Sequence, residues 1–316
     1  MIFREIVLEL TSPFITPWQA DTLFGHIAWS IRDERGDAAL QDFLRRYEEG
    51  EPPVALSDGF ATGWLPRPLV PSNRLVKTEE DARRAKKYKK ARWMTLEQYE
   101  RQSWDELPDE GWHTGDAAEI VTLHNTISRF TGTSLEDGGL YPVAEKVLRH
   151  PSQRLSIFVR FASEADEPVF MHHLGQVAKT GYGSRKTVGK GQFRIAEVRD
   201  RTAWLKERME GCNAEMWLSG GVPAASDPAQ GWFRVETKYG KLGRGWNHAN
   251  PYKRPLTRIM PGATFLVSNY RGFAGRMVRN ISTVPEVVQY AFALTLPLRL
   301  ESDRIEALSD GHAGGI

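Results

Sequence analysis

The sequence predicts an α+β fold, and three observations support this class. The chain has 316 residues, which favours two domains, or one domain with a large insertion. Residues 3–11 and 154–162 alternate apolar and polar side chains with the period of a strand. Between them, residues 20–31 carry apolar side chains at the spacing of one helix face. Strands and helices are therefore both expected in the first half of the chain.

Further segments complete the expected first domain. They are a helix at 37–49, a proline-rich loop with short extended pieces at 51–72, a charged helical stretch at 75–105, extended segments at 118–146 around a turn at 136–139, a helix at 168–179 and a strand at 193–198. Pro168 suits the start of its helix, and Gly181 or Gly183 suits its end. The order strand, helix, insertion, strand, helix, strand is a ferredoxin-like βαββαβ pattern, interrupted between about residues 50 and 150.

A second domain of similar size is expected after residue 200. Its predicted strands lie near 214–219, 232–238, 263–268 and 290–300. We therefore predict a first domain over 1–200, which contains the insertion, and a second domain over 201–316.

The composition is that of a soluble globular protein. Hydrophobic residues make up 41% of the chain and charged residues 26%, which argues against disorder. No apolar run approaches the ~20 residues of a membrane span, and Arg4 and Glu5 interrupt the stretch that an export signal needs. The single cysteine, Cys212, excludes an internal disulfide and an all-cysteine zinc site. We expect a cytoplasmic location without membrane contact.

The basic residues are unevenly distributed, although the net charge is only +2. The segment Arg83–Arg92 reads RRAKKYKKAR, and neither it nor Lys179–Arg194 contains an acidic residue. A third basic cluster spans Lys238–Arg258. Such clusters supply the sequence-independent part of affinity for nucleic acid. A solvated helix face or a surface arm explains Arg83–Arg92 equally well.

The most distinctive local motif is GYGSRKTVGKGQF, residues 181–193. Glycine permits positive φ and close backbone approach, so such a loop can present amide groups to phosphates. It is not a P-loop, because five residues separate Gly183 from Gly189, and Gly191 stands where Ser or Thr would bind magnesium. A merely flexible loop is the alternative. The density of basic residues favours contact with an RNA backbone.

Signals for catalysis or for a metal are weak. His172 and His173 are adjacent and do not have metal-ligand spacing. His26, on the first helix, could serve as a general acid or base, but a histidine with structural hydrogen bonds is the more frequent case. No G-x-S-x-G, H-E-x-x-H or two-carboxylate motif is present. We expect no enzyme activity, no cofactor and no metal.

Several segments in succession resemble one protein family. They are SPFITPWQADTLFGHIAW, PPVALSDGF, LPRPLVP, HNTISRFTGTS at 124–134, the glycine-rich motif, KYGKLG at 238–243, PYKRPL at 251–256, MPGATF at 260–265, YRGFAGRMV at 270–278 and YAFALTLPLRL at 290–300. Together they resemble the RAMP superfamily of CRISPR-associated proteins, and within it the fourth Csm subunit of type III-A effector complexes. The resemblance covers nearly the whole chain, although Arg83–Arg92 matches none of the family's motifs.

The resemblance implies two ferredoxin-like (RRM-like) domains with a thumb-like β-hairpin inserted in the first. It implies a cytoplasmic, non-catalytic RNA-binding subunit that caps the repeat-derived 5′ tag of the crRNA. The implied partners are the large polymerase-like Csm subunit and a backbone Csm subunit, with target RNA bound indirectly. Target cleavage belongs to an aspartate of the backbone subunits, and we give Asp21 no such role, because it reads as a helix-start residue.

The resemblance also implies RNA-binding residues in three segments. On the thumb they are His124, Asn125, Ile127, Arg129 and Thr131; in the loop they are Gly181, Gly183, Ser184, Arg185, Lys186, Gly189, Lys190 and Gly191; in the PYKRPL segment they are Lys253 and Arg254.

Two other functions stay open from the sequence. One is a metal-independent, guide-processing endoribonuclease of the RAMP type that uses His26. The other is a protein-bridging subunit without RNA contact.

Overall fold

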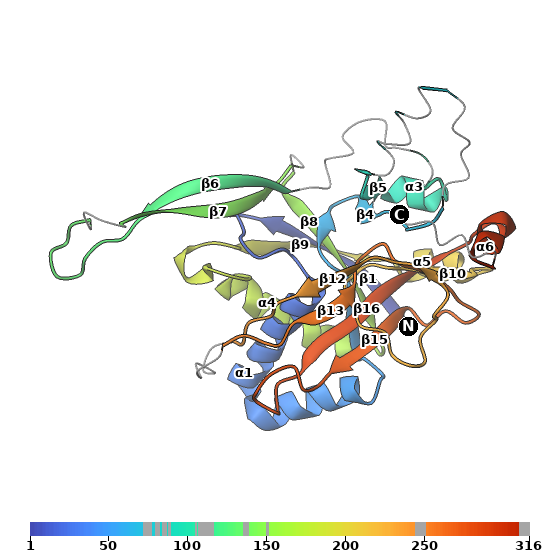
Figure 1. Cartoon of the computed structure of the whole chain (residues 1–316). Helices are drawn as coiled ribbons and strands as arrows, with labels where there is room; N and C mark the ends of the chain where they lie inside the picture. The colour runs from blue at the N-terminus through green and yellow to red at the C-terminus, as the bar shows by residue number, and fades with distance from the viewer. Residues whose placement is uncertain are drawn as a thin grey trace.

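The computed structural model confirms the α+β class, with mixed helices and antiparallel sheets (Figure 1). The structure describes residues 1–71, 78–79, 83, 87, 90–104, 106, 117–134, 139–149, 152–243 and 251–309. Among these residues, none of the helices combines the length and the apolar composition that a membrane span requires.

The first sheet is formed by strands that are far apart in the sequence. Its strands are β1 (Ile2–Leu10), β2 (Val54–Leu56), β3 (Phe60–Ala61), β8 (Arg154–Phe161) and β9 (Phe193–Asp200). They lie in the order β2-β8-β1-β9, with β3 also paired to β8, and the pairs are antiparallel. Helices α1 (Ala20–Glu48) and α4 (Asp166–Thr180) pack against each other on one side of this sheet (Figure 1).

Helix α1 contains a break that the sequence had predicted as a gap between two helices. Gly36 has φ 82° and ψ 178°, which are not helical angles. Glycine adopts this conformation without a steric cost, so the chain changes direction there and continues as the predicted helix at 37–49.

The insertion contains two antiparallel pairs, one short and one long. Strand β4 (Trp64–Pro66) pairs with β5 (Trp93–Thr95), which leads into the short helix α3 (Leu96–Glu100). Strands β6 (Ala117–Asn125) and β7 (Leu140–Leu148) form a long hairpin that projects from the rest of the chain (Figure 1). The extended segments predicted at 118–146 are thus confirmed. The helical prediction for 75–105 is wrong at β5, which is a strand because it pairs with β4, and right at α3. Residues 75–77, 80–82, 84–86, 88–89 and 105, and most of the turn predicted at 136–139, lie outside the described residues.

The second sheet has the order β11-β14-β10-β16-β15. Its members are β10 (Ala214–Trp217), β11 (Gly231–Trp232), β14 (Thr264–Leu266), β15 (Phe273–Val278) and β16 (Gln289–Leu298). Strands β12 (Val235–Lys238) and β13 (Leu256–Ile259) pair with each other and form a separate two-stranded ribbon. Helices α5 (Thr202–Met209) and α6 (Ser302–Ser309) flank this half of the chain in sequence. The sequence analysis missed β13, β15 and the two helices α5 and α6.

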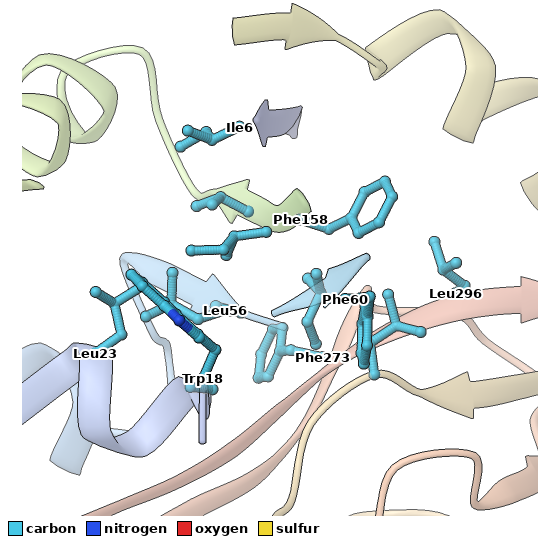
Figure 2. Packing of buried hydrophobic residues seen from close by; sticks show 14 of the residues in the cluster. Ile6, Trp18, Leu23, Leu56, Phe60, Phe158, Phe273 and Leu296 are labelled. Carbon is cyan, nitrogen blue, oxygen red and sulfur yellow. The ribbon is translucent and has the colours of Figure 1, made fainter. Parts of the chain in front are cut away.

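The core is shared between the two sheets. One hydrophobic cluster includes Ile6 and Phe158 of the first sheet together with Phe273 and Leu296 of the second (Figure 2). All ten residues of β16 are buried, because this strand lies between β10 and β15 and is also in contact with α1 and α5. Burial of this apolar surface fixes the two sheets relative to each other.

Candidate nucleic-acid interface

Three segments that are distant in sequence converge at the base of the hairpin. They are the loop after β1 at 11–19, the strand β7 and the glycine-rich loop at 181–193. Phe14 and Lys146 exchange backbone hydrogen bonds of 2.9 and 2.7 Å, which join the first segment to the hairpin. The amide of Gly191 donates to the carbonyl of Pro13 at 2.9 Å, which joins the first segment to the glycine-rich loop. We call this meeting point the junction.

The glycine-rich loop has one defined backbone path. Positive φ occurs at Gly181, Gly183, Arg185, Gly189 and Gly191, and a short 3₁₀ helix, η1 (Lys186–Val188), lies within the loop. At Gly191 an added Cβ would lie 2.1 Å from the carbonyl oxygen of Tyr182, whereas at Gly189 it would meet open space. Gly191 is therefore required both for its φ and for close packing.

An aromatic stack supports the loop from beneath. The rings of Tyr182 and Trp18 are parallel, with centroids 4.0 Å apart. The hydroxyl of Tyr182 donates to the carbonyl of Pro17 at 2.7 Å and accepts from the amide of Gln19 at 3.0 Å. Since Gln19 precedes α1, these contacts attach the loop to the start of that helix.

Most amides of the loop already donate to acceptors within the protein. The residues whose backbone N–H is used in this way are Gly181, Tyr182, Gly183, Ser184, Val188, Gly189, Lys190, Gly191 and Gln192. The expectation that loop amides bind phosphate is therefore corrected for these positions, because a donated N–H is not available to a ligand. The loop can contact a polyanion through its side chains.

Two side-chain contacts connect the glycine-rich loop to strand β7. Lys190 Nζ lies 2.6 Å from Oε1 of the buried Glu145, and this hydrogen bond is the main reason that the pKa of Glu145 is lowered. The Arg185 guanidinium lies over the Tyr141 ring, 5.3 Å from its centroid. The first contact lies near the base of the hairpin and the second near the far end of its strand ladder, where Tyr141 pairs with His124, so basic side chains of the loop follow β7.

The predicted thumb residues extend from the junction to the tip of the hairpin. The His124 ring stacks on Tyr141, with centroids 5.7 Å apart, so His124 belongs to the junction. Asn125, Ile127, Arg129 and Thr131 follow at the tip and are exposed. The tip and strands also expose large apolar side chains, which are Ile120, Val121, Leu123, Ile127, Phe130 and Leu140. A group of apolar side chains of this kind on a projecting arm marks an interaction surface.

His26 has a structural partner at the loop. Its Nε2 accepts the amide hydrogen of Gly183 at 2.9 Å. Burial, with a smaller contribution from the charge of Lys186, lowers the pKa of His26 to about 4. The imidazole is therefore neutral near pH 7, and its acceptor nitrogen is already engaged by the loop.

The predicted RNA contacts Lys253 and Arg254 differ in their surroundings. Lys253 Nζ donates to Gln289 Oε1 at 2.7 Å and to the carbonyl of Val288 at 3.1 Å, and burial lowers its pKa to about 8. Arg254 is exposed and donates to the carbonyl of Asn280. The ammonium group of Lys253 is therefore bound within the protein, while the side chain of Arg254 lies at the surface.

Asp21 lies in the first turn of α1, as predicted. It is buried and pairs with Lys238 at 2.6 Å and with Arg258 at 3.4 Å. These ion pairs connect α1 to the β12–β13 ribbon, so Asp21 has a structural role in this chain.

The adjacent histidines face α1. His172 Nε2 lies 2.7 Å from Glu34 Oε2, and His173 Nδ1 lies 2.9 Å from Ser30 Oγ. The nearest ligand-type atoms of Glu34, His172 and His173 are all within 4.8 Å of one another. The sequence could not indicate this cluster, because Glu34 comes from a different helix.

Comparison with protein-family models and with curated proteins finds no match. Solved structures do match. One chain in the crystal structure of a Csm1-Csm4 cassette in complex with pppApA aligns with a TM-score of 0.56 and 19% identity, over 94% of this chain and 98% of the other. One chain in the crystal structure of a Csm3-Csm4 subcomplex of the type III-A CRISPR-Cas interference complex aligns with a TM-score of 0.59 and 14% identity, over 94% and 99%. In both structures the matching chain is Csm4.

This chain has the fold of Csm4. The resemblance found in the sequence is thus confirmed at the level of the fold. Because the two neighbouring structures share 14% and 19% of residues with this chain, the roles of individual residues rest on the geometry of the junction.

Proposed function

We propose that this chain is the Csm4-type subunit of a type III CRISPR effector complex, where it binds the 5′ repeat-derived tag of the guide RNA without cleaving it. The observation that carries the proposal is the fold match over nearly the full length of both chains. The named partners in those structures, Csm1 and Csm3, give the partners that we propose here: a large subunit and a backbone subunit.

The junction supports RNA binding by side chains. The loop brings Lys190 to Glu145 and Arg185 to Tyr141 along strand β7 of the projecting hairpin, and Lys186 follows Arg185 in the same loop. Basic side chains attract phosphates, and exposed apolar and aromatic groups can pack on unstacked bases. We propose that the loop side chains hold the backbone of the tag and that the hairpin acts as the thumb that separates neighbouring bases.

The ferredoxin-like architecture forms part of the same proposal. The strand order β2-β8-β1-β9, with α1 and α4 on one side, agrees with a ferredoxin-like first domain. We propose that the second sheet belongs to a related second domain, which packs on the first through the shared core.

We propose no catalytic role for His26. A general base must have an accessible acceptor and a pKa near the working pH. In this chain the Nε2 atom accepts a loop amide, and the pKa is about 4. This geometry supports the non-catalytic function over the endoribonuclease.

Co-purification tests the proposal. An affinity-tagged copy of the chain is expressed with the other subunits and a CRISPR array, and the bound proteins and RNA are identified. We expect a large subunit, a backbone subunit and guide RNA that begins with the repeat-derived tag. Recovery of the two proteins without guide RNA, after crosslinking, would instead support a protein-bridging subunit.

A further inference from the structure

The outward face of the β12–β13 ribbon carries aromatic and basic side chains. Side-chain exposure alternates along β12 and the three residues that follow it. Val235, Thr237, Tyr239 and Lys241 are exposed, whereas the residues between them point inward or are small. The residue Tyr239 is 72% exposed. A tyrosine with this exposure presents much of its surface to solvent.

Tyr252 comes from the other side of the ribbon. It pairs with Lys241 in an isolated antiparallel bridge, and Lys241 Nζ lies 5.9 Å from the centre of the Tyr252 ring. Tyr252 is 58% exposed. The bridge therefore brings one lysine and one exposed tyrosine together, with Tyr239 two residues away on the same strand. We call these three residues the ribbon patch.

The charge around the ribbon patch is positive. Arg254 is exposed two residues beyond Tyr252. Glu236, the acidic residue of the described segments 233–243 and 251–259, is held by Arg258 Nη2 at 2.6 Å. Acidic peptides and nucleic acids both suit this charge, but exposed aromatic rings next to a cation specifically suit unpaired bases and their phosphates.

Gly243, two residues after Lys241, and the glycine-rich loop contact the same part of α1. His26 accepts the loop amide of Gly183. Trp29, three residues later, lies directly against Gly243, because a Cβ added to that glycine would be 2.1 Å from Trp29 Nε1. Three residues of helix rise by about 4.5 Å, so both attachments lie within one turn. The glycine-rich loop and the end of the ribbon are thus neighbours on α1.

We propose that the ribbon patch is a second contact surface for single-stranded RNA, in which Tyr239 and Tyr252 stack on bases and Lys241 binds a phosphate. The inference rests on the proposed function, since it extends the RNA path from the junction across α1. It also explains which part of the PYKRPL segment meets RNA: Tyr252 and not Lys253, whose ammonium group is engaged by Gln289.

Binding of a short fluorescent oligoadenylate to the purified full chain tests the patch, at a fixed and stated salt concentration. Tyr239→Ala and Tyr252→Ala should each weaken binding by about tenfold, whereas the Phe variants should stay within about twofold, because stacking needs the ring and not the hydroxyl. Lys241→Ala should reduce the slope of log affinity against log salt by about 1. An abasic oligomer of the same length has no bases to stack on, so the tyrosine variants and the unmodified chain should bind it with the same affinity.

The outcomes separate this inference from the proposed function. If the tyrosine variants bind oligoadenylate normally while Arg185→Ala with Lys186→Ala weakens binding, the ribbon patch is wrong and the junction stands. If neither set of variants changes binding, the ribbon patch and the proposed RNA binding at the junction are both overturned. If the tyrosine variants keep RNA but lose a co-purifying subunit, the ribbon is a protein interface and the inference fails. Unchanged thermal unfolding of the tyrosine variants confirms that they are folded.

Discussion

The glycine-rich loop and the tip of the hairpin were both predicted to bind RNA, but the protein holds them in opposite ways. Most amides of the loop donate to acceptors in the loop itself or elsewhere in the chain, and its Tyr182 ring is stacked on Trp18. The hairpin tip is exposed, and Phe130 is fully exposed. The difference shows that the backbone of the loop is held by the fold while its basic side chains can contact a ligand. The side chains of the tip, in contrast, pack against no other part of the described chain. Substitutions of the packed glycines of the loop should therefore affect stability, whereas substitutions of its basic side chains or of the tip should affect binding.

The largest effect is expected at Gly191. In Gly191→Ala the new Cβ meets the Tyr182 carbonyl in a backbone conformation with φ 66°, so we expect a loss of about 3 to 4 kcal/mol in the free energy of unfolding. Gly189→Ala is the matched control, because it also has positive φ but faces open space, and it should cost about 1 kcal/mol. Denaturant unfolding measures both. Equal losses would mean that the loop is not packed as described.

The next effect concerns pH and His26. The pKa of this histidine is about 4 in the folded chain, below its ordinary 6.5, so the unfolded chain binds more protons between these values. Stability should therefore be complete above pH 6.5 and fall as the pH decreases, by about 2 kcal/mol between pH 8 and pH 5. His26→Gln, which does not titrate, should reduce this slope. If the free energy of unfolding of His26→Gln depends on pH as steeply as that of the unmodified chain, other groups cause the pH dependence.

A smaller effect is expected from the Lys190–Glu145 contact. Lys190→Met removes the partner of a buried carboxylate, and we expect a loss of about 1 kcal/mol, since Lys190 is partly exposed. The pKa of Glu145 is lowered in the folded chain, so the contribution should be present at neutral pH and disappear as the pH falls below about 4.5. A double-mutant cycle with Glu145→Gln measures the coupling. Additive losses would show that the contact contributes nothing.

The smallest effect on stability is expected at the tip. Ile127→Ala with Phe130→Ala should change the free energy of unfolding by less than about 0.5 kcal/mol, because both side chains are exposed. The same variant should weaken association with guide RNA in the assembled complex. A large fall in stability would mean that the tip packs against the rest of the chain.

The sequence predicted the local elements well where they depend on neighbouring residues. The strand at 154–162, the helix at 168–179 and the pair of strands at 118–146 were found near their predicted positions. Strand β15 was missed because it contains Gly275, whose φ of 96° is unusual for a strand. Its place in the sheet is set by pairing with β16, which a local pattern does not reveal.

The candidate site was predictable only in part. The segments that form the site could be named from the sequence, but the contacts that their residues make within the protein could not. The pairing of Lys190 with Glu145 and the engagement of Lys253 by Gln289 join residues far apart in the chain. Four of the acceptors for the loop amides lie in the loop after β1 or on α1, far away in the sequence, so only the folded chain reveals that those amides are occupied.

The most direct test of the central claim compares two guides. The assembled complex is titrated with guide RNA that carries the repeat-derived 5′ tag and with the same guide lacking it, at one moderate salt concentration. We expect tighter binding of the tagged guide, and we expect Arg185→Ala with Lys186→Ala to remove most of that difference, whereas Arg45→Ala, an exposed arginine in the last turn of α1, should not. Equal affinity for the two guides would contradict the account.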